Sequence, residues 1–371
     1  MTRLFLCGDV MIGRGIDQVM PRSVDPRLFE PYIDTAEAYV KLAVDANGPI
    51  PRPVAPAYVW GAALEAIDAL EPDVRIVNLE TAVTTSAVAW PGKEVLYRTH
   101  PANVDVLRAA QIDCCALANN HALDWGYPGL RETLDTVHEA GLATVGAGQD
   151  LAEAQAPISV NGPDGRVIVV AFASTTSGTP LEWAACPDQP GVDVTDEWSD
   201  EVAQAIRTRL QGVKDHGDVV VASVHWGSNW GYEIPNEQRR LARELIDIGG
   251  VDVVHGHSSH HPRAIELYRG RLILYGCGDF ITDYEGIAGY EAFRDDLVLA
   301  YFPNLDPTTG RTIRLDMIPF RLRRFRLTRP SEADATWLAD TLDRQSRPFG
   351  LRVEIGSDRT LVAHPLGRFV T

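Results

Sequence analysis

Short apolar runs of strand length alternate with segments of helical periodicity along the chain, and this alternation constrains the fold more than any other feature. The apolar runs predict strands at 3–8, 74–79, 112–118, 167–173, 218–225, 251–255, 272–277 and 297–302. The intervening segments predict helices at 57–70, 102–110, 128–140, 199–214 and 236–248. Such alternation predicts an α/β protein whose largely parallel sheets are covered by helices.

Two segments interrupt the alternation. Residues 21–56 contain seven prolines, and residues 175–198 are rich in Thr, Pro, Asp and Trp, so both are predicted as long loop insertions. Such loops are often functional, and we expect residues 21–56 to cover a crevice as a lid; an inert surface loop is the alternative. Residues 331–371 predict a closing helix at 332–344 and a hairpin, as part of one domain spanning 1–371.

The composition argues against several classes of protein. Hydrophobic residues make up 45% of the 371 residues, which is enough for a packed core. Asp and Glu (51) outnumber Lys and Arg (34), and the net charge of -17 disfavours nucleic acid and anionic membranes as partners. The five cysteines include no Cys-x-x-Cys pair, which indicates free thiols in a reducing compartment. Because no apolar run approaches the roughly 20 residues of a membrane helix, we expect a cytoplasmic protein.

Polar side chains that can bind metal collect where five predicted strands end. They lie in Cys7-Gly8-Asp9, Asn78-Leu79-Glu80, Asn119-Asn120-His121, His225-Trp226-Gly227 and the histidine-rich run 255–261. The carboxyl ends of parallel strands face one crevice, so these residues predict a metal site there. Mixed His, Asp, Glu and Asn ligands suit zinc, manganese or iron better than calcium or magnesium.

Single residues of this set have other interpretations. Asp9 could be a helix N-cap, and Asn119 could be a turn residue. Cys7 could be a soft ligand, although buried cysteine more often acts as a small hydrophobe. The common position at five strand ends, and not any one residue, therefore carries the metal prediction.

With these residues in place, the chain resembles the CapA-like family, which is named for a poly-γ-glutamate capsule biosynthesis protein. The matching motifs are GDVMIGR (8–14), NLE (78–80), ANNHALDWG (118–126), HWG (225–227), GHSSHHP (256–262) and, more weakly, YGCGDF (275–280). The resemblance implies a calcineurin-like metallophosphoesterase fold, which is a sandwich of two mixed β-sheets flanked by helices. It also implies one or two divalent ions (manganese, zinc, iron or calcium) at the strand ends.

The resemblance also implies a role for each residue that matches a motif. The metal ligands would be Asp9, Glu80, Asn120, His225 and His257. His121 would be the general acid that faces the substrate, and His260 would be a ligand or an acid–base group.

The chain departs from the metallophosphoesterase pattern at the first metal position. Those enzymes begin with Asp-x-His, whereas the residue two after Asp9 is Met11. The later Gly-His-x-His is stretched to Gly-His-Ser-Ser-His, and Asp279 stands where the family more commonly has Asn. The missing imidazole predicts a weakened first position and one tightly held ion.

Three functions remain open. The first is acid–base chemistry on a peptide, as in a group resembling the epimerase that inverts a C-terminal residue of a lasso-peptide precursor; His121, Asp124 and His260 would remove and return the α-proton. The second is hydrolysis of a small phosphoester. The third is a non-catalytic subunit that binds a peptide or polymer. The expected partner is accordingly a peptide, such as a precursor C-terminus, or a small phosphoester.

Overall fold

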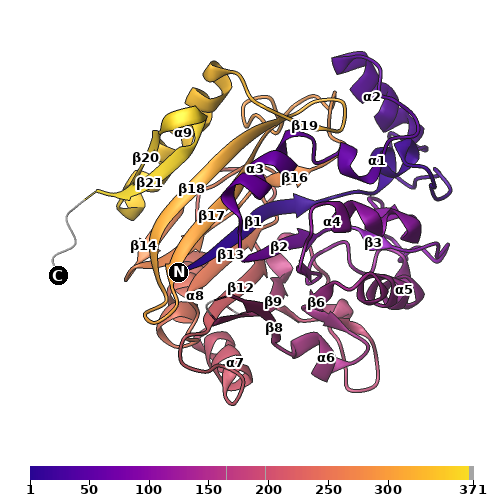
Figure 1. Cartoon of the computed structure of the whole chain (residues 1–371). Coiled ribbons are helices and arrows are strands. Elements are labelled where there is room, and N and C mark those ends of the chain that lie inside the picture. Colours follow the sequence, from indigo (N-terminus) through magenta and orange to yellow (C-terminus); the bar gives the residue numbers. More distant parts are fainter. Residues whose placement is uncertain (164, 197, 367–371) are drawn as a thin grey trace.

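The larger of the two main sheets forms the centre of the molecule in the computed structural model, which describes residues 1–163, 165–196 and 198–366 (Figure 1). Among the described residues this sheet has ten strands. Its main path runs β20 (Leu351–Ile355), β21 (Leu361–Pro365), β18 (Arg311–Leu322), β17 (Leu297–Asp306), β1 (Thr2–Val10), β2 (Val74–Leu79), β5 (Cys114–Ala116) and β6 (Ala143–Val145). Outside this path, β16 (Asp279–Ile281) pairs with β1 and β19 (Leu327–Thr328) pairs with β18. The strands from β1 to β6 are parallel, and those from β17 to β20 are antiparallel.

A second sheet packs against the first. Its path in the described chain runs β11 (Val194–Thr195), β9 (Gly165–Ser174), β12 (Val219–His225), β13 (Val253–His257), β15 (Arg271–Leu274) and β14 (Ile265–Tyr268), and β8 (Ile158–Gly162) pairs with β9. The neighbours from β11 to β15 are parallel, whereas β8 and β14 pair antiparallel. Both sheets are therefore mixed.

Apolar side chains from both sheets form the layer between them. Leu4, Leu6 and Ile76 of the first sheet belong to one buried cluster with Val169 and Val221 of the second. Strands buried on both faces have nearly continuous apolar sequences, which explains the run VIVVAFA at 167–173.

Helices cover the outer face of each sheet. The first is covered by α1 (Arg14–Val19), α3 (Ala62–Leu70), α4 (Asp105–Ala109) and α5 (Gly126–Glu139). The second is covered by α7 (Asp200–Leu210) and α8 (Asn236–Asp247). The predicted α/β class, with a sandwich of two mixed sheets flanked by helices, is confirmed.

The prediction of residues 21–56 as a loop was wrong in part, because they contain α2 (Glu37–Asn47). The prolines of this segment lie on either side of the helix, between Pro31 and Pro49 none occurs, and Gly48 (φ 89°) ends the helix. Tyr39 and Val40 are buried, and the helix packs against α1.

Residues 175–198 also contain regular structure that was not predicted. Here β10 (Gly191–Val192) pairs with β7 (Ala147–Gly148), while Val194 and Thr195 form β11 beside β9. Such two-residue strands are too short to produce a periodic signal.

Several predicted boundaries also moved. The helix predicted at 57–70 begins at Ala62, because Gly61 has φ 46° and separates it from a short 3-10 turn. The strand predicted at 251–255 continues to His257, since its pairing with β12 extends to that residue. The strand predicted at 272–277 ends at Leu274.

The C-terminal segment closes the first sheet, as predicted. The helix α9 (Glu332–Ser346) begins with a capping box between Ser331 and Asp334, and the hairpin of β20 and β21 pairs with β18. Figure 1 shows these elements together at one edge of the molecule. Residues 367–371 of the prediction lie outside the described residues.

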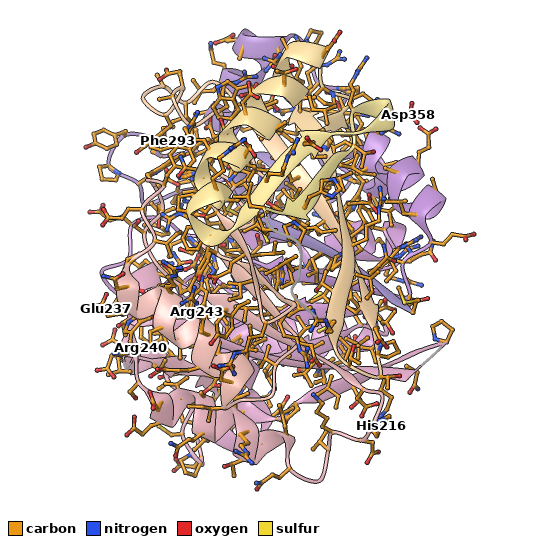
Figure 2. The ribbon with its side chains drawn as sticks, turned by 90° about the vertical axis from the view of Figure 1, so that its left-hand side faces the viewer. His216, Glu237, Arg240, Arg243, Phe293 and Asp358 are labelled. Carbon is orange, nitrogen blue, oxygen red and sulfur yellow. The ribbon has the colours of Figure 1, made fainter. Side chains whose placement is uncertain are left out.

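The outer helices carry charged side chains. Figure 2 shows Glu237 and Arg240 of α8 on the outside of the molecule, and both are exposed. Within the described residues, no helix combines the length and apolar character needed to cross a membrane.

Candidate metal centre

The strand register brings polar side chains of both sheets to one place. Asp9 of β1 lies beside Asn78 of β2 and beside Asp279 of β16, and His225 of β12 lies beside His257 of β13. These strands are parallel, so their carboxyl ends meet at one rim of the sandwich.

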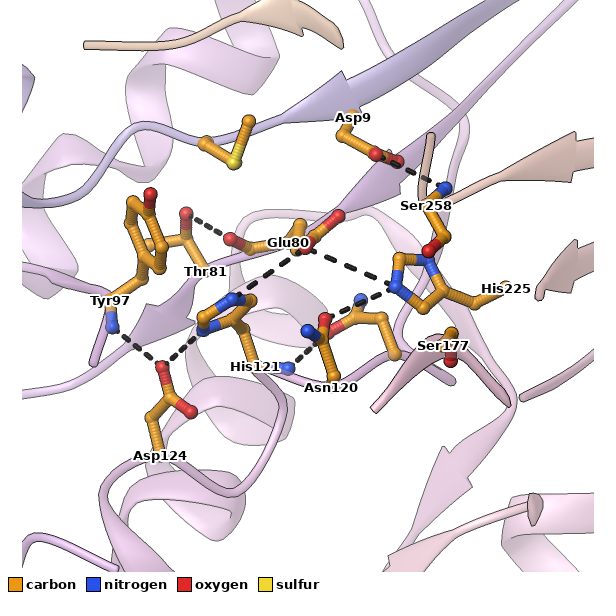
Figure 3. A network of polar contacts seen from close by, with 12 residues as sticks. Asp9, Glu80, Thr81, Tyr97, Asn120, His121, Asp124, Ser177, His225 and Ser258 are labelled. Atoms are coloured by element: carbon orange, nitrogen blue, oxygen red, sulfur yellow. Dashed lines mark hydrogen bonds and ion pairs between the residues drawn. The ribbon is translucent and has the colours of Figure 1, made fainter. Parts of the chain in front are cut away.

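The five residues that the sequence proposed as ligands lie on two sides of the His225 ring, with His257 at Nδ1 and with Asn120 and Glu80 at Nε2. His225 Nδ1 lies 2.8 Å from His257 Nδ1, and His225 Nε2 lies 3.1 Å from Asn120 Oδ1. Asp9 Oδ1 lies 3.9 Å from His257 Nδ1. Glu80 Oε1 lies 4.0 Å from His225 Nε2 (Figure 3). Asp9, Glu80, His225 and His257 are almost completely buried.

Two groups of side chains in the described residues could each hold a metal ion. One consists of Asp9, His225 and His257, and the other consists of Asp9, His260 and Asp279. Within each group the possible ligand atoms lie within 4.8 Å of one another. Asp9 belongs to both groups.

The electrostatics of the carboxylates suit a cation. Burial, together with the charge of Asp279, raises the pKa of Asp9 to about 7. Burial and the charge of Asp9 raise the pKa of Glu80 well above its usual value. A divalent ion would offset this repulsion, and the set of carboxylates, imidazoles and an amide oxygen fits manganese, zinc or iron.

A chain of buried hydrogen bonds fixes the tautomer of His257. His255 Nε2 donates to the carbonyl oxygen of Cys7 (2.7 Å), so His255 Nδ1 accepts from the hydroxyl of Ser223 (3.1 Å). The Ser223 oxygen then accepts from His257 Nε2 (2.9 Å). In a neutral ring, His257 Nδ1 is therefore left with a free lone pair that points toward Asp9 and His225.

His225 has a polar contact at each of its two ring nitrogens. A neutral imidazole carries one N–H, whereas His225 faces an unprotonated nitrogen of His257 at one side and Asn120 Oδ1 at the other. Only one of these contacts can be a hydrogen bond. Burial lowers the pKa of His225 well below its usual value, so the ring is neutral and one of its nitrogens keeps a lone pair.

Two asparagines orient the carboxylates. Asn78 Nδ2 donates to Asp9 Oδ1 (2.7 Å) and to Glu80 Oε2 (3.2 Å). Asn119 Nδ2 donates to Asn78 Oδ1 (3.0 Å), and its own side-chain oxygen accepts from the backbone N–H of His121. Asn119 is thus more than a turn residue, because it links two strand ends.

His121 is held by a buried carboxylate beside the ligand set. Its Nδ1 donates to Asp124 Oδ2 (2.6 Å), so Nε2 faces Glu80 Oε1 at 3.7 Å (Figure 3). Lys93 forms an ion pair with Asp124, and the backbone N–H of Tyr97 donates to the same carboxylate (2.6 Å). Burial lowers the pKa of His121 to about 4, so its resting form is a neutral base, whereas the resemblance implied a general acid.

His260 has a second carboxylate partner, Asp279, whose Oδ1 lies 2.9 Å from His260 Nδ1. Both His121 and His260 line one pocket of about 380 Å³, together with Glu80 and Asn120. Lys93 and Arg14 also line it, and Trp230 and Tyr290 stack at 3.9 Å between ring centroids along another wall.

Part of the predicted lid reaches the same pocket. Glu30 and Tyr39 line it, and both bind Arg14 through their side-chain oxygens. The segment thus lies on the side of the strand ends, as expected for a cover.

Sequence reasoning missed several residues of the site. Lys93 lies on a loop without a recognisable pattern, and Ser223 is an ordinary member of a buried strand. Asp279 departs from the commoner Asn of the family, and no pattern in the sequence indicates its role.

A family comparison identifies the chain. Residues 3–284 match the model of the family described as "Bacterial capsule synthesis protein PGA_cap", and the chain belongs to this family. It is 46% identical to the "Probable polyglutamine synthesis accessory protein" of Mycobacterium tuberculosis over 98% of this chain and 96% of that protein. It is 32% identical to the "PGA biosynthesis protein CapA" of Bacillus subtilis over 56% of this chain and 52% of that protein.

Similar solved structures include a phosphatase from Mycoplasma pneumoniae, with a TM-score of 0.48 and 11% identity over 89% of this chain and 95% of that one. A hypothetical protein from Thermus thermophilus has a TM-score of 0.46 and 16% identity over 86% of this chain and 99% of that one. Since both TM-scores lie below 0.5, the fold assignment rests on the strand order of this chain.

Proposed function

We propose that the pocket is the active site of a metal-dependent hydrolase that cleaves a small phosphoester. The observation that carries this proposal is the position of His121. Its Nδ1 is engaged by Asp124, which leaves Nε2 as the proton-accepting atom beside the carboxylate of Glu80. A fixed imidazole next to a set of metal ligands is the arrangement that metal-assisted hydrolysis requires.

Asp9, Glu80, Asn120, His225 and His257 would hold the ion. When bound, the ion would supply positive charge that stabilises negative charge developing on a phosphoryl oxygen. His121 Nε2 accepts a proton from the attacking water, and the leaving oxygen, on the opposite side of the phosphorus, takes its proton from solvent. Asp124 keeps the imidazole in the required tautomer, and Lys93 forms an ion pair with Asp124.

An anionic substrate would depend mainly on the bound ion for its charge balance, because the cations of the pocket are paired with carboxylates. Lys93 and Arg14 both line the pocket, and the Lys93 side chain is 19% exposed. The ion would offset the repulsion that a phosphate meets from the carboxylates Glu30, Glu80 and Asp295 of the same pocket and from a chain with net charge -17.

A direct assay tests this proposal. The purified protein would be incubated with p-nitrophenyl phosphate and bis-p-nitrophenyl phosphate in the presence of Mn²⁺, Zn²⁺, Fe²⁺ or Ca²⁺. We expect metal-dependent turnover that is lost in His121→Gln and kept in His216→Gln, whose exposed side chain lies elsewhere on the surface (Figure 2). No turnover with any ion would reject the hydrolase.

Epimerisation at a peptide Cα is the second candidate, and the pair of His260 and Asp279 favours it. It gives the pocket a second imidazole, so protons could be removed and returned by two different groups. The names of the relatives suggest a glutamyl peptide as substrate. Incubation of such peptides in heavy water should then place one deuterium at a single Cα; if neither reaction occurs, a non-catalytic binding role remains.

A further inference from the structure

We propose that Asp9, His260 and Asp279 form a second divalent-cation site, in which Asp279 supplies the ligand that position 11 lacks. The inference shares the pocket of the proposed function but does not depend on the reaction. It concerns the residues of this chain that depart from the family, and it changes the expected number of ions from one to two.

The backbone places Asp279 next to Asp9. The short strand β16 pairs with β1 in parallel register, and Asp9 N–H donates to the carbonyl oxygen of Gly278 (3.0 Å). This close approach needs glycine, because a Cβ at Gly8 would lie 1.5 Å from that oxygen. The motifs Gly8-Asp9 and Gly278-Asp279 thus bring two carboxylates to one point.

The Asp279 carboxylate is only partly satisfied by protein groups. Oδ1 lies 2.9 Å from His260 Nδ1, whereas Oδ2 is buried and has no hydrogen-bond partner among the described residues. The residue is 1% exposed. A buried carboxylate oxygen without a partner is unfavourable, and a cation held with Asp9 and His260 would satisfy it.

Several carboxylates lie close together around this group. Asp9, Glu80 and Asp279 interact through their charges, and Asp295 lies close enough to Asp279 to join them. The cations of the pocket are already paired, since Lys93 binds Asp124 and Arg14 binds Asp283 and Glu30. A divalent ion between Asp9 and Asp279 would offset the repulsion between these two carboxylates.

The side chain at position 11 cannot take this role. Met11 is buried, and its sulfur lies 4.0 Å from the hydroxyl of Tyr284. A thioether is a soft ligand, whereas two carboxylates and an imidazole suit a hard or borderline ion such as manganese. Asp279 therefore replaces the missing imidazole with a carboxylate from a different strand.

The test counts ions. The protein would be stripped with a chelator, dialysed against Mn²⁺ and analysed for manganese per chain, and its EPR spectrum recorded. We expect two ions in the unmodified protein and the exchange-coupled spectrum of a pair that shares the Asp9 carboxylate. Asp279→Asn should hold one ion and give the spectrum of an isolated ion. Asn has the shape of Asp and is the commoner residue of the family here, so this variant is expected to fold.

Asp295→Asn is the matched control, because it removes a nearby charge but no member of the group; it should keep two ions. One ion in the unmodified protein, or two in folded Asp279→Asn, would overturn the second site and leave the proposed function standing. No ion in the unmodified protein would reject both. The count in the unmodified protein is decisive even if a variant fails to fold.

Discussion

The pocket contains two imidazole–carboxylate pairs that look alike and differ in how their carboxylates are satisfied. Asp124 of the first pair receives His121, the backbone N–H of Tyr97 and the ammonium of Lys93. Asp279 of the second pair receives His260 at one oxygen, and its other oxygen has no partner in the described part of the chain. Both oxygens of Asp124 have hydrogen-bond or ion-pair partners, so this carboxylate can only orient His121. The second oxygen of Asp279 can still bind a cation.

This difference indicates separate uses for the two pairs. The pair of His121 and Asp124 is suited to proton transfer, because the ring is fixed and its free nitrogen faces the pocket. The pair of His260 and Asp279 is suited to an external charge. If His260 and Asp279 hold an ion, His260 is not free for acid–base chemistry. Hydrolysis is then a better-supported function than epimerisation, which needs a second free imidazole.

The largest effect is expected at Asp9, which both metal groups share. Asp9→Asn should lose both ions, because the neutral amide cannot offset their charge. Elemental analysis after dialysis against Mn²⁺ measures the loss. Chelator should lower the unfolding temperature of the unmodified protein and leave that of Asp9→Asn unchanged, since an ion at 100 times its Kd adds about 2.7 kcal/mol of stability. A variant that retains either ion would show that Asp9 is not shared.

The next effect separates the two histidines. His121→Gln should reduce kcat about a hundredfold or more while manganese content stays the same, because it removes the proton acceptor but no member of a metal group. His260→Gln should instead lower the manganese content. Equal loss of metal in both variants would mean that the two pairs have the same role.

A smaller effect on metal affinity is expected at Ser223, which hydrogen-bonds the ligand His257. Ser223→Ala breaks the chain of hydrogen bonds that leaves the lone pair on His257 Nδ1, and such supporting contacts change metal affinity about 10- to 100-fold. Ser223→Thr keeps the hydroxyl and should keep the affinity, as measured by calorimetric titration with Mn²⁺. Unchanged affinity in Ser223→Ala would remove the tautomer argument.

The smallest effect concerns Lys93 and pH. Burial first, and the Lys93 charge in addition, keep the pKa of His121 low at about 4, so the neutral base is present at all pH values above that. Lys93→Met removes a positive charge that opposes protonation of His121, so the pKa of His121 rises. The acidic limb of the plot of kcat against pH then moves to higher pH. Lys93→Arg keeps the charge and should keep the limb in place. A limb that does not move in Lys93→Met would show that Lys93 does not act on His121.

The sequence predicted the sandwich and the main ligand set because both depend on local patterns. Apolar runs mark the strands, and residues such as Asp9, Asn120 and His225 stand where those strands end. Lys93 was not predictable, because it reaches Asp124 from a loop whose position depends on tertiary packing. The role of Asp279 was likewise not predictable from the sequence, because only the pairing of β16 with β1 brings this residue next to Asp9.

The most direct test is the anomalous diffraction of crystals soaked with Mn²⁺. The central claim is that the strand ends around Asp9 form a metal centre with two neighbouring positions. We predict two anomalous peaks in contact with the Asp9 carboxylate, one toward His225 and His257 and the other toward His260 and Asp279. The absence of any peak at Asp9, with manganese bound elsewhere, would contradict the account.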